Sequence, residues 1–412
     1  MADFLRRPRG GYAWLLLIAV ALFAVNLRAS ATSVGPLLSE IQQALPLSAT
    51  GAGVLTALPG FVFAAAGLGA ASVARKLGLH RALVVVCAMI AIGAAARPYL
   101  PTAAFFAFTG LALAGMAFGN VLAPVFVKRH FPNRLGAVMS TYTVFLAIGA
   151  TLPTAIGQPL AAVGSWRSSL AFWALPALAA GIVMAVVWGK ERGGVRLQTR
   201  ATTSLWQVAA SAKARWIAAF FGLQSMNAYI HFGWVAQVYR DAGIDPTTAG
   251  WLITIITFMG IPGGLIVPSL TVRLPSLTPL VVTFTALLIV GYLGLLFAPA
   301  SLPWLWATCL GLSGFCFPLA LTLISLRARD LEVATALSGF SQSIGYIAAG
   351  AGPLLIGILV DLTGGWRIPL IVLLLGTLAL AIAGIQACRP GDVDDELDDG
   401  GTAVLGTGTK DD

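Results

Sequence analysis

Long apolar runs, separated by short polar segments, follow one another along nearly the whole chain. A helix needs about 20 mostly apolar residues to cross the hydrocarbon core of a bilayer, and it satisfies its own backbone hydrogen bonds there. The pattern therefore predicts an all-α polytopic membrane protein. Its twelve transmembrane helices are expected near residues 12–38, 48–73, 82–100, 103–127, 135–160, 168–188, 216–238, 246–270, 280–298, 303–326, 334–360 and 367–387.

The composition narrows the class of protein further. Of 412 residues, 58% are hydrophobic and only 10% are charged, whereas a soluble globular chain carries about 25% charged residues. Eight of the 16 acidic residues lie beyond Pro390, so the rest of the chain is nearly free of carboxylates. This composition excludes an ordinary soluble enzyme, a disordered chain and a nucleic-acid binder, despite the net charge of +9.

Positive charges predict the orientation in the membrane. With a cytoplasmic N-terminus, 20 of the 25 Lys and Arg residues fall in cytoplasmic segments, Arg28 falls within a span, and four fall outside. Positive residues favour the cytoplasmic side, so both termini are expected there, in a multi-pass protein of the plasma or inner membrane. The four outside cations are Arg97, Arg167, Arg240 and Arg367.

The first apolar run also imitates a secretory signal peptide, with Arg6 to Arg9 before it and Ala29-Ser-Ala31 after it. Cleavage would leave eleven spans. We favour an uncleaved span, because an internal repeat pairs this run with the seventh span.

The repeat is visible by eye. Thr50-Gly-Ala-Gly-Val-Leu55 matches Thr247-Thr-Ala-Gly-Trp-Leu252 at an offset of 197, and Gly164, Trp166 and Arg167 match Gly364, Trp366 and Arg367 at an offset of 200. Two parallel six-helix halves are therefore predicted. The expected parts are an N-terminal bundle at 1–188, a cytoplasmic central loop at 189–215, a C-terminal bundle at 216–388 and a disordered acidic tail at 389–412.

Arg28 is the sharpest functional candidate, and it lies with Asn26 near the middle of the first span. An arginine at the centre of a membrane helix costs about 2.5–3.5 kcal/mol on insertion scales. No acidic residue falls in the middle of a predicted span. Arg28 either reaches outward to Glu40 or points into an aqueous cavity and binds an anionic or strongly accepting substrate. We favour the cavity, with a purely structural arginine as the alternative.

The seventh span carries a polar stripe, because four of its residues are spaced by 3, 4 and 3 positions and share one helical face. The stripe faces either a substrate or neighbouring helices, to which it would hydrogen-bond. Its members are Gln224, Asn227, His231 and Trp234. His231 titrates near neutrality and so either carries a proton or donates as a neutral ring to substrate, and we favour the second.

Four further residues are weaker candidates for the walls of a substrate cavity. Asn120 follows a run of small residues, which is more typical of close helix packing. Tyr142, Gln342 and Tyr346 have the amphipathic character of a cavity wall. The four cysteines lie in or beside apolar segments without metal-ligand spacing. We therefore expect no disulfide, no metal site and no cofactor.

Several motifs carry a family resemblance. They are Asn26-Leu-Arg28 with Thr32-Ser-Val-Gly-Pro36, Gly119-Asn-Val-Leu-Ala-Pro124 with Lys128-Arg-His-Phe-Pro132, Phe220-Phe-Gly-Leu-Gln-Ser225 and Phe340-Ser-Gln-Ser-Ile-Gly-Tyr346. With them the chain resembles the cyanate-porter and 2-nitroimidazole-exporter branch of the major facilitator superfamily, over essentially all twelve spans. One departure is Arg75, which stands where the family's loop between helices two and three has an Asp. The acidic partner of that salt bridge is therefore missing at this position.

The resemblance implies a secondary transporter that moves a small planar, cyanate-like anion or polar compound by alternating access. The substrate would lie between the two bundles. The alternative is efflux of nitroimidazole-type or other small heterocyclic drugs. A membrane enzyme is disfavoured because no nucleophile–base set falls in the spans, and a sensor because no folded soluble domain is predicted. The expected partners are the lipid bilayer and a small anionic substrate, with proton coupling open, and we expect a monomer.

Overall fold

The computed structural model describes residues 10–131, 134–190 and 205–397, and within them the regular structure is helical, without strands. Each predicted span falls on one helix or on consecutive helices. Ten helical segments of the described residues are long and apolar enough to cross a membrane. The second span lies on α3 (Ala49–Leu77), and the seventh lies on α10 (Ala212–Ile230), the π-helical turn η5 (His231–Val235) and α11 (Ala236–Asp241).

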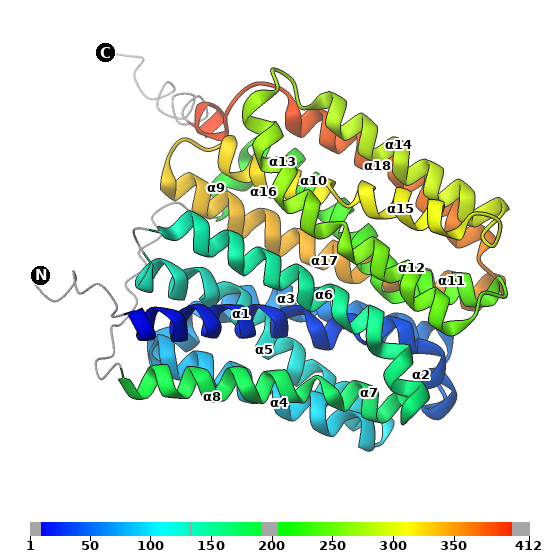
Figure 1. Cartoon of the computed structure of the whole chain (residues 1–412). Coiled ribbons are helices and arrows are strands. Elements are labelled where there is room, and N and C mark those ends of the chain that lie inside the picture. The colour runs from blue at the N-terminus through cyan, green and yellow to red at the C-terminus, as the bar shows by residue number, and fades with distance from the viewer. Residues whose placement is uncertain (1–9, 132–133, 191–204, 398–412) are drawn as a thin grey trace, which may run out of the picture. The chain divides into compact units, whose positions relative to one another are not determined.

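The chain forms two compact units: residues 1–41 with 65–198, and residues 42–64 with 199–412. In unit 1 the helix α1 packs against α5, α6 and α8, and α4 packs against α5 and α8 (Figure 1). A Cβ on Gly149 of α6 would lie 2.1 Å from the carbonyl oxygen of Val25, so only glycine allows this approach to α1. The elements of unit 1 are α1 (Gly10–Thr32), η2 (Gly35–Leu37), α2 (Leu38–Ala44, its first four residues), the second half of α3, α4 (Leu79–Ala96), η3 (Arg97–Tyr99), α5 (Thr102–His130), α6 (Leu135–Val163), α7 (Trp166–Phe172) and α8 (Ala174–Lys190).

Unit 2 is built around α10, which packs against α16, α17 and α18, while α14 packs against α15 and α18 (Figure 1). Its core is apolar and contains the fully buried Phe220 and Phe221 of α10. Besides α10, η5 and α11, its helices are the first half of α3, α9 (Leu205–Ala210), α12 (Pro246–Phe258), α13 (Gly260–Arg273), α14 (Thr278–Phe297), α15 (Pro303–Ser313), α16 (Cys316–Leu326), α17 (Leu331–Thr363) and α18 (Arg367–Cys388).

The first half of α3 packs within unit 2, although the internal repeat assigns this span to the first half of the chain. Small residues form the contact with α17: a Cβ on Gly60 would lie 2.3 Å from the Gly350 nitrogen, and one on Gly357 would lie 2.5 Å from the Ala49 carbonyl oxygen. Glycines let two helix backbones approach this closely. The carboxylate of Asp361 then accepts hydrogen bonds from the backbone N–H groups of Ala49 and Thr50. By its contacts the first half of α3 therefore belongs to unit 2, and the predicted bundle boundaries stay a prediction.

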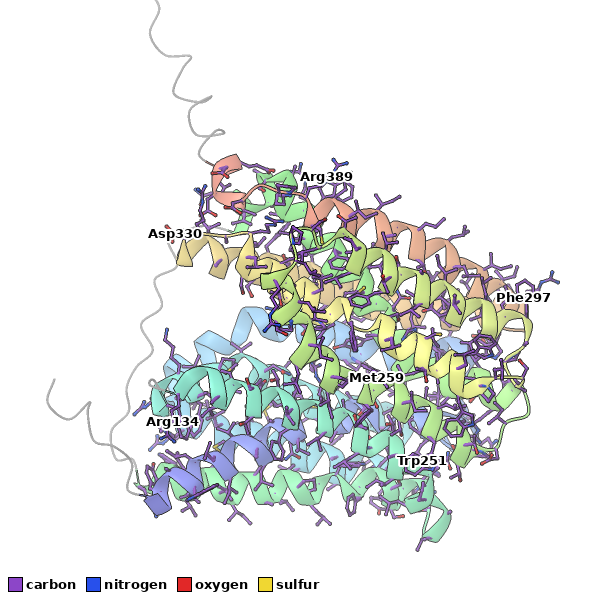
Figure 2. All side chains as sticks on the ribbon, turned by 45° about the horizontal axis from the view of Figure 1, so that its top comes forward. Arg134, Trp251, Met259, Phe297, Asp330 and Arg389 are labelled. Atoms are coloured by element: carbon purple, nitrogen blue, oxygen red, sulfur yellow. The ribbon has the colours of Figure 1, made fainter. Side chains whose placement is uncertain are left out.

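Large apolar side chains on the outer surface of unit 2 are exposed, as expected of helices that face lipid. Trp251 of α12 is 46% exposed and Phe297 of α14 is 77% exposed (Figure 2). Within the same unit, Asp330 and Arg389 lie at the opposite end from Phe297 (Figure 2).

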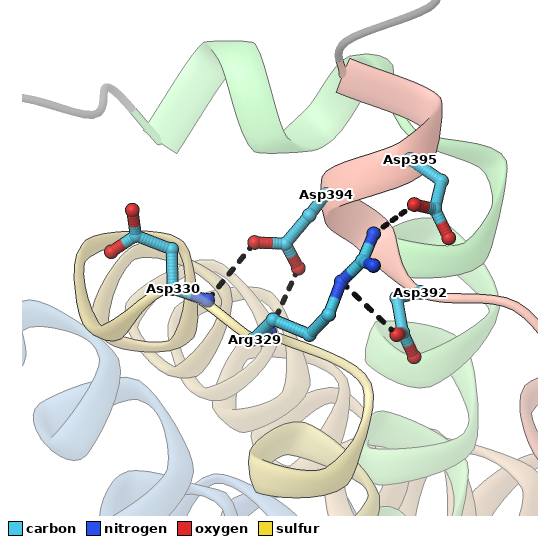
Figure 3. Close-up of polar contacts among 5 residues, drawn as sticks. All are labelled: Arg329, Asp330, Asp392, Asp394 and Asp395. Carbon is cyan, nitrogen blue, oxygen red and sulfur yellow. Dashed lines mark hydrogen bonds and ion pairs between the residues drawn. The ribbon is translucent and has the colours of Figure 1, made fainter.

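Residues 389–397 depart from the disorder predicted for 389–412, whereas residues 398–412 lie outside the described part of the chain. Asp394 accepts hydrogen bonds from the backbone N–H groups of Arg329 and Asp330, at 2.9 and 3.0 Å, where α17 begins (Figure 3). The Arg329 guanidinium pairs with Asp392 and Asp395. The N–H groups bonded to Asp394 belong to the two residues just before α17 (Leu331–Thr363). A carboxylate at the N-terminus of a helix is favoured by the helix dipole.

Candidate functional site

The two polar residues predicted to act together on α1 lie on different faces of the helix. Successive residues turn by about 100°, so positions 26 and 28 are about 200° apart. Asn26 is buried within unit 1, where its amide nitrogen donates to the carbonyl oxygens of Leu22 at 2.7 Å and Pro176 at 3.0 Å. Its amide oxygen is buried without a hydrogen-bond partner. Arg28 is half-buried and interacts with its surroundings.

Buried polar contacts hold the end of α1 that follows Arg28. The guanidinium of Arg97 donates to the carbonyl oxygen of Ser30 at 3.1 Å and to the hydroxyl of Ser33 at 3.0 Å. The last carbonyl groups of a helix lack partners within the helix, and a cationic side chain satisfies them. The positive-charge count assigned Arg97 to an outside segment, yet its side chain is fully buried. Sequence reasoning therefore missed Arg97 as a residue that positions α1.

Asn120 of α5 and Tyr142 of α6 are brought together in unit 1. The Tyr142 hydroxyl donates to the amide oxygen of Asn120 at 3.4 Å, a long hydrogen bond. The amide nitrogen of Asn120 donates to the Met116 carbonyl oxygen at 3.0 Å. Asn120 is half-buried and Tyr142 is buried. The pair links two helices and leaves the Asn120 side chain partly accessible.

In unit 2, Asn227 and His231 are joined by Tyr292, a fully buried residue of α14 that the sequence analysis did not single out. The Tyr292 hydroxyl donates to the Asn227 amide oxygen at 2.6 Å and lies 2.9 Å from Nε2 of His231. A hydroxyl has one hydrogen, so with that hydrogen directed to Asn227 it accepts from an Nε2–H of His231. In this arrangement the Nε2–H of His231 donates to tyrosine, whereas the sequence analysis favoured donation to substrate.

The other two residues of the α10 stripe also bond within unit 2. Gln224 donates to the Ser225 hydroxyl at 2.6 Å and to the Phe221 carbonyl oxygen at 3.0 Å. Trp234 lies in the π-helical turn η5, and its indole N–H donates to the Pro353 carbonyl oxygen at 3.0 Å. Short π-helical segments occur often at functional sites. The stripe faces the interior of its own unit.

On α17, Gln342 and Tyr346 lie one turn apart and are both half-buried. Gln342 donates to the Ser338 hydroxyl at 2.7 Å. The ring of Tyr346 contacts those of Phe63 and Phe221 edge-on, with centroids 5.6 and 5.8 Å apart. These residues form a partly accessible wall, with aromatic rings beside one amide.

Comparisons with known proteins agree with this architecture. Residues 14–350 match the model of the Major Facilitator Superfamily. The chain is 34% identical to the uncharacterized transporter YycB of Bacillus subtilis (strain 168), covering 91% of this chain and 93% of that one. It is 32% identical to the 2-nitroimidazole transporter of Escherichia coli (strain K12), over 92% and 96% of the two chains.

Two further proteins extend the comparison. The cyanate transport protein CynX of Escherichia coli (strain K12) is 30% identical over 85% of this chain and 91% of its own. The crystal structure of a D-xylose-proton symporter superposes with a TM-score of 0.71 over 92% of this chain and 96% of that chain, at 12% identity, and so supports the fold. All of these named relatives are transporters rather than enzymes. The family resemblance is confirmed, and the chain belongs to the Major Facilitator Superfamily of membrane transporters.

Proposed function

We propose that this transporter moves a small planar anion of cyanate-like chemistry by alternating access, with Arg28 as the group that binds its charge. The observation that carries the proposal is the position of Arg28: a half-buried guanidinium within an apolar span. The α1 sequence contains no acidic residue. A guanidinium in such a place is costly, and its planar set of donors suits a compact anion.

Other polar residues are further candidates for contact with the substrate. Asn26 lies on the other face of α1, where its amide oxygen is buried without a hydrogen-bond partner. Asn120, bonded to Tyr142, is half-buried in unit 1. Gln342 and Tyr346 of unit 2 offer an amide and an aromatic wall. We propose that Asn120, Tyr142, Gln342 and Tyr346 also contact substrate, that Asn26 joins α1 to α8 through Pro176, and that the Gln224, Asn227, His231 and Trp234 stripe acts mainly by shaping α10.

Efflux of a neutral heterocycle is the second candidate function, because one relative named above is a 2-nitroimidazole transporter, while another is a cyanate transport protein. A neutral heterocycle presents ring nitrogens and nitro oxygens that also accept hydrogen bonds from a guanidinium. The two candidates differ in the charge that crosses the membrane.

Flux measurements in proteoliposomes test the proposal. We expect labelled cyanate to accumulate in protein-containing vesicles and its uptake to follow an imposed membrane potential, because an anion moving without a coupled proton carries net charge. Uptake that ignores the potential but follows a pH gradient would indicate proton coupling. Saturable 2-nitroimidazole flux without cyanate flux would replace the anion proposal with the efflux function.

A further inference from the structure

Two histidines outside the proposed substrate site face one another in unit 1. His80 lies in the first turn of α4, His130 is the last residue of α5, and these two helices pack together. The Nε2 atoms of the two rings are 3.4 Å apart. His80 is 7% exposed. The sequence analysis assigned no role to this pair.

The second ring nitrogen of His130 determines its tautomer. Nδ1 lies 2.9 Å from the carbonyl oxygen of Phe126, and a carbonyl oxygen only accepts hydrogen bonds, so Nδ1 carries the hydrogen. In the neutral ring Nε2 then presents its lone pair toward His80. Metal-binding histidines are usually held in this way, with the other ring N–H donated to a backbone carbonyl.

The distances between the rings fit two ligands of one tetrahedral ion. With Zn–N bonds of about 2.0–2.1 Å, two imidazole nitrogens on a tetrahedral Zn²⁺ lie about 3.3–3.4 Å apart, and their ring centroids about 5.2 Å apart. The observed values are 3.4 Å for the nitrogens and 5.3 Å for the centroids. A straight N–H···N hydrogen bond of the same length would place the centroids about 5.7 Å apart.

We propose that His80 and His130 bind one Zn²⁺ ion, or a divalent ion of similar chemistry, with water at the remaining positions. Imidazole nitrogen suits such ions. Among the described residues no group of three or more His, Cys, Asp and Glu could hold a metal, so within them the proposed site has two protein ligands. Phe126 covers one side, with its ring centroid 4.2 Å from that of His130 and 5.9 Å from that of His80. The ion would join the end of α5 to the start of α4.

Cationic side chains beside His80 and His130 in the sequence should affect the affinity of the pair for Zn²⁺. The guanidinium of Arg81 lies over the Trp188 ring of α8, 5.0 Å from its centroid, and is held by that helix. Lys128 is exposed on the last turn of α5, two residues before His130. Its charge repels a dication, so Lys128→Gln should tighten Zn²⁺ binding by about two- to fivefold.

Titration of the detergent-purified full chain, carrying an affinity tag without histidine, tests the site. We expect one equivalent of Zn²⁺ to bind, Mg²⁺ not to compete, and His80→Ala or His130→Ala each to weaken binding by about tenfold or more. The chain has three histidines in all, so His231→Gln is the matched control and should leave Zn²⁺ affinity unchanged. Binding that survives both alanine substitutions would overturn the proposal.

Spectroscopy with Co²⁺ separates metal ligation from a change in folding. A tetrahedral Co²⁺ complex has strong visible absorption bands, which we expect in the wild-type protein and in Lys128→Gln. His130→Gln keeps the size and polarity of the side chain but removes the ring nitrogen, and it should lose the bands while its thermal melting stays cooperative. Absence of saturable Zn²⁺ binding and of these bands in the folded wild-type protein would show that the pair is only hydrogen-bonded.

Discussion

The first span, on α1 in unit 1, and the seventh span, on α10 in unit 2, correspond in the two sequence repeats, yet the surroundings of their polar residues differ. In unit 2, Asn227 of α10, His231 of η5 and Tyr292 of α14 form a buried chain of hydrogen bonds. On α1, Arg28 keeps a charge at a half-buried position, and Asn26 has a buried amide oxygen without a partner. The polar groups of Asn227 and His231 are hydrogen-bonded within unit 2. On α1, the amide oxygen of Asn26 has no hydrogen-bond partner.

This difference separates two uses of polar groups in an apolar protein. A buried network whose members are all bonded makes a core specific and rigid. A guanidinium within an apolar span is costly, and its planar set of donors suits an anionic ligand. We therefore assign charge recognition to α1 and a mainly structural role to the stripe on α10, and the following predictions test that division.

The largest effect is expected from Arg28→Ala. Loss of a charge-assisted contact to substrate costs about 2 kcal/mol or more, so anion flux should fall about 30-fold or more, with normal expression and melting. Arg28→Lys should also fail, because an ammonium group lacks the planar fork of donors.

Arg273→Ala is the matched control for this experiment. Arg273 is an exposed arginine in the last turn of α13, and its removal should leave flux unchanged. Initial rates of cyanate uptake in proteoliposomes provide the measurement. Wild-type rates of cyanate uptake in Arg28→Ala would contradict the proposal that α1 recognises the charge of the substrate.

A smaller and different effect is expected from Tyr292→Phe on the α10 side. The substitution leaves the Asn227 amide oxygen and the His231 Nε2–H buried without partners, which costs about 1–3 kcal/mol. The melting temperature in detergent should fall, while the KM for the transported anion stays near the wild-type value. A strong rise in KM without a change in melting would move the α10 network into the substrate site.

Much of the fold could be predicted from the sequence, because apolar runs of span length leave few alternatives to membrane helices. The polar stripe of α10 was also found, since its spacing places the four residues on one face. Periodicity does not reveal what that face contacts. Tyr292 lies in a uniformly apolar helix and carries no signal of its bond to His231.

The burial of Arg97 and the order of the acidic tail also depend on tertiary contacts. Arg97 follows an apolar run in the sequence, and we predicted that it lies in an outside segment. In the structure its side chain is buried against the end of α1. The first part of the acidic tail has the composition of a disordered segment. It is ordered because its carboxylates reach unsatisfied N–H groups where α10 and α17 begin. Neither the burial of Arg97 nor these carboxylate contacts can be read from composition or spacing.

The smallest predicted effect concerns the start of α10, where the tail residue Glu396 accepts hydrogen bonds from the Ser211 hydroxyl at 2.7 Å and the Lys213 backbone N–H at 3.1 Å. Partial burial raises the pKa of Glu396. These hydrogen bonds lower it by a larger amount, so the pKa of Glu396 in the folded protein lies below the ordinary value. The contact therefore stabilises the docked tail at neutral pH, and this contribution is lost as the pH falls through the lowered pKa.

A carboxylate at a helix N-terminus contributes about 0.3–1 kcal/mol, so Glu396→Gln should reduce the amide-exchange protection of residues 389–397 only severalfold at neutral pH. The difference between wild type and variant should shrink as the solution is acidified below the pKa of Glu396, because both side chains are then neutral. Anion flux through the α1 site should stay near its wild-type value in this variant. A difference in protection that persists at acidic pH would show that the carboxylate charge does not hold the tail on α10.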